Sequence, residues 1–278
     1  MKSEFDMAAK AAAYIKEHMT AQPEIGIVLG SGLGELCNEM NNPDVIPYED
    51  IPHFPVSLAP GHEGRLYIGE IGGKIVAAFK GRFHLYEGYS AKQVAFPVRV
   101  MKLLGIETLI STNAAGGLNP DYYRGALMVL NDHINMMGAN PLTGPNDDRF
   151  GERFPDMLNV YTPELIKLAH RAADAESIEL FEGVYYAVQG PNFETPAELR
   201  MMRMLGGDII GWSTVPETLA ARHMNMKILA ITLVTDMSVP DTLEYVDAQI
   251  VLDVAKAAVP KFVRLMTRFL ELLPGKEA

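Results

Sequence analysis

The sequence predicts an α/β fold, because short apolar runs alternate with segments of helical periodicity along the chain. The first such run, Ile25–Leu29, is too short for a helix and rich in β-branched residues, and the glycine turn Gly30–Gly34 follows it. Strands that alternate with helices form a largely parallel sheet covered by helices. No repeat, low-complexity tract or linker divides the chain, so we expect one domain over residues 1–278.

The individual elements follow these two patterns in order. Phe5, Ala8 and Ile15 recur at helical spacing and predict an amphipathic opening helix. Gly72–Gly73 stands between two strand-like runs and predicts a hairpin. The remaining patterns predict strands at 65–70, 74–80, 107–112 and 184–188, an apolar run at 126–130, helices at 90–104, 164–173 and 196–204, and further strand and helix segments at 208–210, 219–223, 228–234 and 247–273.

The composition excludes several classes of function. The formal charge is −11, from 24 basic and 35 acidic residues, which disfavours non-specific binding to nucleic acid or to an anionic membrane. Cys37 is the single cysteine, so neither an intrachain disulfide nor a thiolate metal cluster can form. No apolar run approaches the roughly 20 residues that cross a bilayer, and the charged first residues do not form a secretory signal. We therefore expect a soluble, cytoplasmic protein.

Two enzyme classes are disfavoured by missing motifs. The seven histidines form no His-Glu-x-x-His pair, so no metal ion is expected. The chain also lacks Gly-x-Ser-x-Gly, the nucleophile turn of many serine hydrolases. Catalysis through a metal or a serine nucleophile is therefore not expected.

Four glycine-rich or polar turns each follow a strand-like run and are candidates for a common site. They span residues 30–34, 81–88, 113–117 and 190–196. Ligands of α/β sheets bind at the carboxyl ends of strands, so these turns are expected to converge on one edge. The first turn suits an oxyanion, because its glycines let backbone amides point inward. The alternative interpretation is that these glycines only form a tight turn between a strand and a helix.

The turn Gly81–Gly88 has the richest chemistry of the four. Strand alternation places Arg82, His84 and Tyr86 on one side if the extended conformation persists. The guanidinium of Arg82 suits a fork-like grip on a phosphate, and Glu87 can hold an imidazolium at His84. The alternative interpretation is a solvated strand end with a chance charge pair.

The other polar groups suit a flat heterocycle and its neighbours. Phe193 can stack on such a ring while Glu194 accepts hydrogens from its edge, although the same stretch is also typical of a helix entry capped by Thr195. Asn113 offers an amide at another strand end, with a plain turn as the alternative. Asp236 ends a strongly apolar run, a position where a lone aspartate is usually a cap or turn former.

Seven sequence motifs together indicate a protein family far more specifically than any one of them does alone. They are Gly30-Ser-Gly-Leu-Gly34, Gly61-His-Glu-Gly64, Gly81-Arg-Phe-His-Leu-Tyr-Glu-Gly88, Thr112-Asn-Ala-Ala-Gly-Gly-Leu118, Asn146-Asp-Asp-Arg-Phe-Gly-Glu-Arg-Phe-Pro155, Gly190-Pro-Asn-Phe-Glu-Thr-Pro-Ala-Glu198 and Ser213-Thr-Val-Pro-Glu217. In order and approximate spacing, the chain resembles the trimeric, low-molecular-mass purine nucleoside phosphorylases from about Ile25 to Leu270.

This resemblance implies a single α/β domain with a central mixed sheet, partly closed into a barrel and surrounded by helices. It also implies a homotrimer with sites near the subunit contacts. In the implied reaction, inorganic phosphate attacks the anomeric carbon of a purine nucleoside and releases the base and pentose 1-phosphate, as in purine salvage. No cofactor is then needed, because phosphate is itself the nucleophile and the enzyme positions it and stabilises the separating charge.

The resemblance also assigns roles to individual residues. It implies that phosphate is held by Ser31, His62, Arg82, His84, Asn113, Ala114 and Ser213. It implies that the sugar contacts Tyr86, Trp212, the region of Val246, and Phe154 of a neighbouring subunit. It implies that the base is surrounded by Phe193, Glu194 and Asp236. The catalytic residues are then His84, Glu87, Glu194 and Asp236, with Glu87 steadying His84.

Three positions depart from the pattern of the enzymes that cleave inosine and guanosine. Those enzymes typically have asparagine at the position of Asp236, methionine at that of Trp212, and a histidine near Val246 that reaches the sugar 5′-hydroxyl. Asp236 and the absent histidine resemble the related methylthioadenosine phosphorylases, which accept 6-aminopurines. Glu194 indicates the opposite preference, because in 6-oxopurine enzymes this carboxylate accepts the N1 hydrogen that adenine lacks.

Three alternatives to a purine nucleoside phosphorylase stay open at this point. A methylthioadenosine phosphorylase performs the same chemistry, but its turnover depends on the 5′ substituent. A nucleosidase uses water instead of phosphate. A non-catalytic nucleoside-binding protein binds without turnover, and the presence of Arg82, His84, Glu87 and Asn113 disfavours it.

We predict that the chain accepts adenosine-type substrates. An ionised Asp236 accepts hydrogens from an exocyclic amine, and only a pocket that raises its pKa lets it donate to O6 or N7. Steady-state kinetics with inosine, guanosine, adenosine and 5′-methylthioadenosine measure this preference, and an inosine preference of orders of magnitude would contradict it. Asp236→Asn is expected to shift the ratio toward 6-oxopurines; an unchanged ratio would show that Asp236 does not contact the base.

Overall fold

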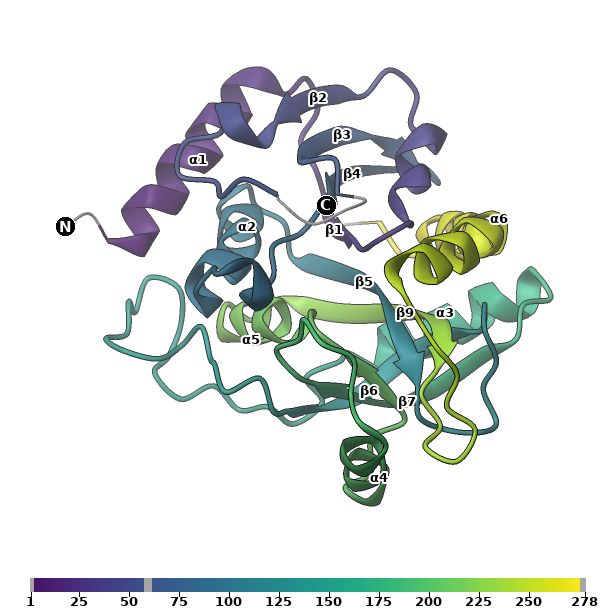
Figure 1. Ribbon diagram of the computed structural model, residues 1–278. Helices are drawn as coiled ribbons and strands as arrows, with labels where there is room; N and C mark the ends of the chain where they lie inside the picture. Colours follow the sequence, from purple (N-terminus) through teal and green to yellow (C-terminus); the bar gives the residue numbers. More distant parts are fainter. Residues whose placement is uncertain (1–2, 58–61, 276–278) are drawn as a thin grey trace.

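The computed structural model describes residues 3–57 and 62–275, in which strands and helices alternate as predicted (Figure 1). The strands are β1 (Ile25–Leu29), β2 (Asp44–Pro47), β3 (Arg65–Ile71), β4 (Lys74–Lys80), β5 (Thr108–Gly117), β6 (Leu127–Asn135), β7 (Leu180–Ala187), β8 (Ile209–Gly211) and β9 (Lys227–Met237). The helices are α1 (Glu4–His18), α2 (Ala91–Leu103), α3 (Pro163–Ala175), α4 (Pro196–Met204), α5 (Val215–His223) and α6 (Ala248–Leu272). Short 3-10 helices lie at η1 (Gly34–Glu39), η2 (Tyr48–Asp50) and η3 (Leu85–Glu87).

The sheet is partly closed into a barrel, as the resemblance implied. Its strand order is β2-β3-β4-β1-β5-β8-β7-β6-β9, and β9 also pairs with β5. This second pairing closes β5, β8, β7, β6 and β9 into a ring, while β1, β4, β3 and β2 extend from β5 as an open sheet. The predicted hairpin is the antiparallel pair β3–β4.

Two expectations from the residue pattern are wrong. The sheet is mixed rather than largely parallel, because β2–β3, β3–β4, β5–β8 and β6–β9 pair antiparallel. Residues 113–117 are the last part of β5 and not a turn. They remain extended because β9 continues beside them, with Asn113 opposite Thr232 and Gly117 opposite Met237.

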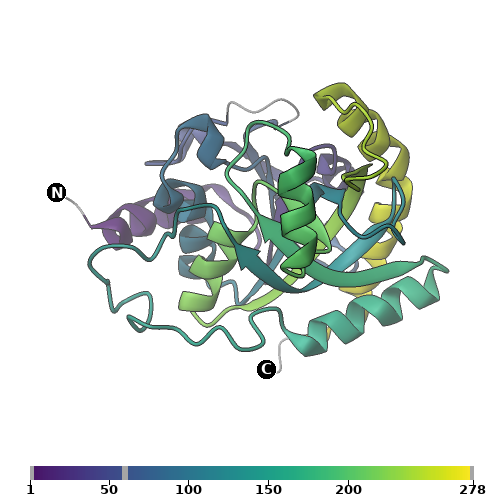
Figure 2. The same cartoon turned by 60° about the horizontal axis from the view of Figure 1, so that its bottom comes forward.

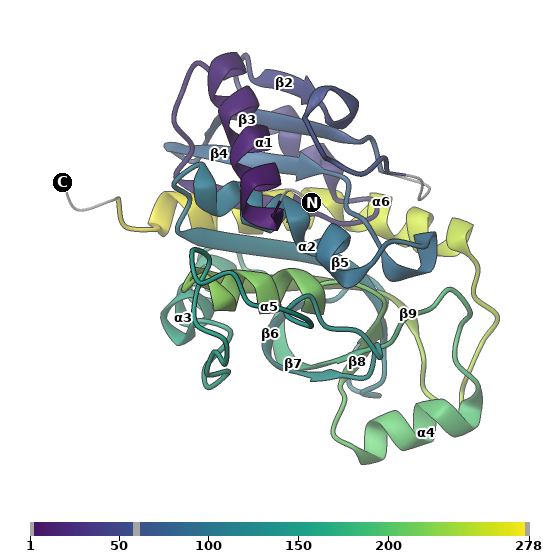
Figure 3. The same ribbon diagram turned by 90° about the vertical axis from the view of Figure 1, so that its left-hand side faces the viewer.

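Helices cover both faces of the sheet. In Figure 1, α1, α2 and α5 lie on one side, and α3 and α6 lie on the other. Helix α4 stands apart at one end (Figure 3), where Leu199 and Met202 pack against Leu118, Tyr186 and Ile210. The long connection from β6 to α3, teal in Figure 2, runs along the outside of the molecule. None of the helices in the described ranges is long and apolar enough to cross a membrane.

Strand β5 positions the site because its partner on one side changes along its length. Strand β1 pairs with residues 108–111, and β8 pairs with Gly116 and Gly117. Residues 112–115 therefore have no strand partner on that side in the described structure. Their backbone faces an opening between the ends of β1 and β8.

The layer between α6 and the sheet should contribute strongly to stability. Phe262 is fully buried in this layer. Phe262→Ala is expected to lower the free energy of unfolding, measured by urea denaturation, by about 3–5 kcal/mol, because it leaves a cavity. The control is Met204→Ala on α4, whose side chain is 81% exposed and whose loss should cost less than about 0.5 kcal/mol. Equal losses in the two variants would contradict this packing.

Candidate active site

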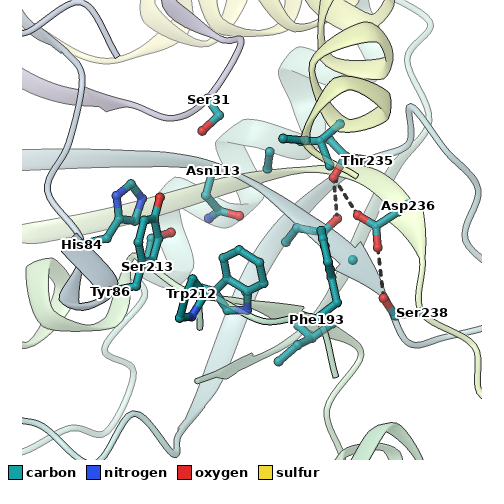
Figure 4. A pocket seen from close by; sticks show the side chains of 18 of the residues that line it. Ser31, His84, Tyr86, Asn113, Phe193, Trp212, Ser213, Thr235, Asp236 and Ser238 are labelled. Carbon is teal, nitrogen blue, oxygen red and sulfur yellow. Dashed lines mark hydrogen bonds between the residues drawn. The ribbon is translucent and has the colours of Figure 1, made fainter. Parts of the chain in front are cut away.

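A cavity of about 270 Å³ lies beside the open stretch of β5 (Figure 4). Its walls come from the ends of several strands, from the segment after β7 and from the first turns of α6. The predicted convergence of the four segments is confirmed, since residues from 30–34, 81–88, 113–117 and 190–196 all contribute. The lining residues are Ser31, Arg82, His84, Tyr86, Asn113, Ala114, Ala115, Gly116, Pro191, Phe193, Glu194, Ile210, Gly211, Trp212, Ser213, Thr235, Asp236, Ser238, Ala248, Val251 and Leu252.

Most residues singled out from the sequence are in this lining, and four are not. His62 and Glu87 lie behind Ser31 and His84, which they hydrogen-bond. Val246 lines a smaller neighbouring cavity of about 60 Å³, together with Glu194 and Asp236. Phe154 is 82% exposed on the β6–α3 connection. Gly61 lies outside the described residues.

His84 is held by a carboxylate three residues later in the chain. The 3-10 turn η3 brings Glu87 back, so that its Oε1 lies 2.8 Å from His84 Nδ1 and accepts the His84 backbone N–H at 2.9 Å. Burial lowers the pKa of His84, and Glu87 opposes that shift. A neutral ring that donates Nδ1–H to Glu87 leaves Nε2 as a hydrogen-bond acceptor toward the cavity.

The 3-10 turn η3 also ends the extended conformation after Arg82. Strand alternation therefore does not continue to Tyr86. Tyr86 stacks on the His84 ring with centroids 4.6 Å apart and an interplanar angle of 18°. Burial raises the pKa of the Tyr86 phenol to about 12, so it stays protonated at neutral pH. Arg82, His84 and Tyr86 still reach one cavity, but through a turn and not through strand alternation.

Arg82 grips a carboxylate of the protein itself. Its Nε donates to Glu217 Oε1 at 3.1 Å and its Nη2 donates to Glu217 Oε2. The two donors that were predicted to bind phosphate therefore bind Glu217. Nη2 also donates to Ser111 Oγ and Nη1 to the Thr112 carbonyl. Among the described residues these bonds use four of the five guanidinium hydrogens, which leaves one at Nη1. Arg82 can therefore give a ligand one hydrogen bond but not a bidentate grip.

Ser31 is oriented by His62. The Nδ1 of His62 accepts the Arg82 backbone N–H at 3.0 Å, so the neutral ring carries its proton on Nε2, which lies 3.2 Å from Ser31 Oγ. Burial lowers the pKa of His62 to about 3, helped by His84 and Arg82. Because His62 donates to Ser31, the Ser31 hydroxyl hydrogen is left to donate to a ligand.

The open backbone of β5 adds an amide donor. The Thr112 carbonyl points to the side of β1, where Arg82 binds it. Because backbone groups alternate in direction along a strand, the N–H of Ala114 points to that same side. No strand covers this side at Ala114 in the described structure, so its amide faces the cavity that Ala114 lines.

Asn113 is anchored by a strained residue, Thr214, and Ser213 is anchored by Tyr185. Thr214 is fully buried with φ of +67°, a conformation that is unusual for a β-branched residue. Its Oγ1 accepts the Asn113 Nδ2 hydrogen at 3.0 Å. The Ser213 backbone N–H donates to the Tyr185 hydroxyl at 3.2 Å. The buried Asn113 Oδ1 has no partner in the described part of the chain and lies at the cavity.

Asp236 marks the opposite end of the cavity. Its two carboxylate oxygens accept hydrogens from Thr235 and Ser238, each at 3.0 Å (Figure 4). Burial raises the pKa of Asp236, and these two hydroxyls partly oppose the shift. Gly116 makes room for this group, since a Cβ there would fall 2.8 Å from Asp236 Oδ2.

Glu194 lies near Asp236 and contacts the single tryptophan. Its Oε1 accepts the indole N–H of Trp212 at 3.0 Å. Burial raises the pKa of Glu194, the indole hydrogen bond lowers it, and Asp236 raises it further. Phe193 presents a half-exposed ring beside the indole, with centroids 5.2 Å apart. A flat apolar surface and two carboxyl groups therefore meet at this end.

Sequence reasoning gave no role to Glu217, Thr214 or Ser238. Glu217 ends the motif Ser213-Thr-Val-Pro-Glu217, and a buried arginine after a strand requires such a partner, so its role was open to inference from charge. The conformation of Thr214 and the bond from Ser238 to Asp236 depend on backbone geometry that has no sequence signal. Side chains of α6 that line the cavity, Ala248, Val251 and Leu252, are all apolar. In the residues that the structure describes, no group of three or more His, Cys, Asp or Glu side chains is placed to hold a metal ion.

The chain is similar in sequence and in fold to known phosphorylases. A family model described as the phosphorylase superfamily matches residues 24–271. Purine nucleoside phosphorylase 1 of Bacillus subtilis is 52% identical over 231 residues, which are 83% of this chain and 85% of that protein. Purine nucleoside phosphorylase of Rattus norvegicus is 43% identical over 275 residues, 96% of this chain and 95% of that one. The crystal structure of Schistosoma mansoni purine nucleoside phosphorylase in complex with adenosine has a TM-score of 0.93 and 40% identity, covering 98% of each chain.

The Arg82–Glu217 pair should be essential for stability. Both side chains are almost completely buried, so Glu217→Ala leaves an unpaired buried charge. This variant is expected to lose about 3–5 kcal/mol in the free energy of unfolding, measured by chemical denaturation. The control is Asp241→Ala, which breaks the exposed Arg200–Asp241 pair and should cost less than about 1 kcal/mol. A loss for Glu217→Ala as small as the control would contradict the assignment.

Proposed function

Since the chain belongs to the phosphorylase superfamily and is a purine nucleoside phosphorylase within it, we propose that it cleaves purine nucleosides with orthophosphate in the cavity described above. The products are the free base and pentose 1-phosphate. The observation that carries this proposal is the division of the cavity into two ends. One end has hydrogen-bond donors directed at an anion, and the other has a flat aromatic surface with two carboxyl groups.

Phosphate is expected at the first end. The Ser31 hydroxyl, the Ala114 amide, the Ser213 hydroxyl and one Arg82 hydrogen can all donate to its oxygens. The charge of Arg82 is balanced by Glu217, so the anion is held mainly by oriented dipoles. The acceptor Nε2 of His84 suits the remaining hydroxyl hydrogen of hydrogen phosphate. Glu87 then stabilises the imidazolium if the proton moves to the ring.

Positioning and charge stabilisation account for the chemistry. A phosphate oxygen forms a bond to the anomeric carbon while the bond from that carbon to the purine nitrogen breaks, and the electron pair leaves with the base. The sugar gains positive character next to the phosphate anion, which stabilises it. The purine gains negative character near Glu194 and Asp236, where hydrogen bonds must compensate. A protonated Asp236 can donate one of them, and its raised pKa supports this role.

Adenosine-type bases are proposed to be accepted because of Asp236. In its ionised form it offers lone pairs to an exocyclic amine at a position where the related 6-oxopurine enzymes have an amide. Schistosoma mansoni purine nucleoside phosphorylase, whose structures are similar to this one, has been crystallised with adenosine and with inosine. We propose that this chain likewise accepts both types of base.

A second candidate, methylthioadenosine phosphorylase activity, is favoured by one observation. The helix α6 lines the cavity with Ala248, Val251 and Leu252 and adds no polar side chain to it. An apolar wall suits a methylthio group better than a hydroxyl. The ratio of kcat/KM for 5′-methylthioadenosine and adenosine discriminates the two activities.

We propose a cytoplasmic homotrimer in which Phe154 completes a neighbouring subunit's cavity. Phe154 is a large apolar side chain that is 82% exposed, and Leu158 on the same connection is 72% exposed. Exposed large apolar side chains on one connection support a protein contact there. Light scattering measures the oligomeric state, and a monomer would contradict this arrangement.

Release of base from inosine, guanosine and adenosine, measured with and without phosphate, tests the function. Turnover is expected only with phosphate; equal turnover without phosphate would identify a nucleosidase, and tight binding without turnover a binding protein. Ser31→Ala is expected to raise the KM for phosphate about tenfold, the effect of one lost hydrogen bond of about 1.4 kcal/mol. The KM for the nucleoside should change little in this variant. An unchanged KM for phosphate together with a raised KM for the nucleoside would show that phosphate does not bind at Ser31.

A further inference from the structure

Trp212 is the single tryptophan of the chain, and it lies between the two ends of the cavity. Its ring is fixed on several sides. The Phe193 ring lies 5.2 Å away at 54°, and the Tyr86 ring lies 5.9 Å away at 83°. Gly190, with φ of +70°, packs directly on the indole, since a Cβ there would fall 2.8 Å from its Cδ2. An indole held in this way has little freedom to rotate.

The indole N–H is directed at Glu194. It donates to Oε1 at 3.0 Å, and in the described chain it is the one side-chain donor to this carboxylate. The backbone amide of Glu194 also hydrogen-bonds this carboxylate. A carboxylate has about four acceptor positions, so it can still accept a hydrogen from a ligand. Figure 4 shows the indole between Tyr86 and Phe193.

We propose that Trp212 is a positioning residue that orients the Glu194 carboxylate, so that Glu194 can accept the N1 hydrogen of a 6-oxopurine. This inference rests on the proposed function for its substrate, but the Trp212–Glu194 pair itself exists without substrate. It goes beyond the contact with the sugar that the resemblance assigned to Trp212.

The surroundings of Glu194 explain why such a donor is needed. Burial disfavours the ionised form, and the Asp236 and Glu198 carboxylates add repulsion. Glu244 also lines the small cavity next to Glu194, and its partner Arg124 is exposed. No cation faces Glu194 among the groups that shift its pKa. The indole N–H is thus the main side-chain interaction that favours the carboxylate over the neutral acid.

The first test uses the fluorescence of Trp212 in the unliganded protein and needs no activity. Because no other tryptophan is present, a pH titration of the emission reports the charge of the group bonded to the indole. The wild type is expected to show one transition with a midpoint above 4.5, the ordinary value for a glutamate pKa. Glu194→Gln should abolish this transition, and the matched control Glu198→Gln, an exposed carboxylate four residues away, should retain it. A transition that persists in Glu194→Gln would overturn the pairing.

The second test uses Trp212→Phe, which keeps an aromatic ring and removes the N–H. The acid limb of kcat/KM for inosine is expected to move up by about one pH unit, because the pKa of Glu194 rises when its donor is lost, and kcat/KM at neutral pH should fall about tenfold. The KM for phosphate should not change. A merely structural role would change both KM values and leave the acid limb in place, and that result would overturn the proposal.

Binding of the free base tests the role of Trp212 independently of the proposed reaction. If the wild type shows no phosphate-dependent turnover, the proposed function fails, but calorimetry with hypoxanthine still compares wild type and Trp212→Phe. About tenfold weaker binding in the variant is expected. Equal affinity would show that the indole does not orient Glu194 for the base.

Discussion

Strand β5 pairs with β1 over its first four residues and with β8 over its last two, and the backbone between these segments must find its partners elsewhere. Buried backbone groups without partners are costly, so this gap requires a side chain or a ligand. The Arg82 guanidinium satisfies the Thr112 carbonyl, and the Ala114 amide is left toward the cavity. The neighbouring strand ends provide the remaining groups, so the closure of the barrel at β5 and the location of the cavity have one common cause.

The end of the cavity at Ser31 and Arg82 combines little net charge with many oriented hydrogen bonds. Arg82 and Glu217 neutralise one another, and burial keeps His62 and His84 neutral. In the proposed function, a protein of net charge −11 holds phosphate through fixed hydroxyls and an amide at short range. At the other end, burial raises the pKa of both Glu194 and Asp236, and each carboxyl has hydrogen-bond donors that counter the shift. The electrostatics of both ends depend on exclusion of water.

Sequence reasoning predicted the alternation of strands and helices, the hairpin and the convergence of the four segments, because these follow from periodicity and glycine turns. It failed where tertiary pairing overrides local pattern. Asn113–Gly117 looks like a turn, but β9 holds it extended. Extended geometry after Arg82 ends at the 3-10 turn, which needs the reciprocal bonds of His84 and Glu87. The partner of Arg82 lies 135 residues later in the chain, beyond the reach of any local argument.

Thr214 shows that the cavity is maintained at some cost to the fold. Its left-handed backbone is unfavourable for a branched side chain, by an amount on the order of 1–3 kcal/mol, and the surrounding helix and strand must hold it. Glycine would relax this strain but would release the amide of Asn113 from its anchor. Selection of the chain for heat resistance alone would therefore tend to enrich substitutions that damage its chemistry, so thermostable variants should be screened for turnover at the same time.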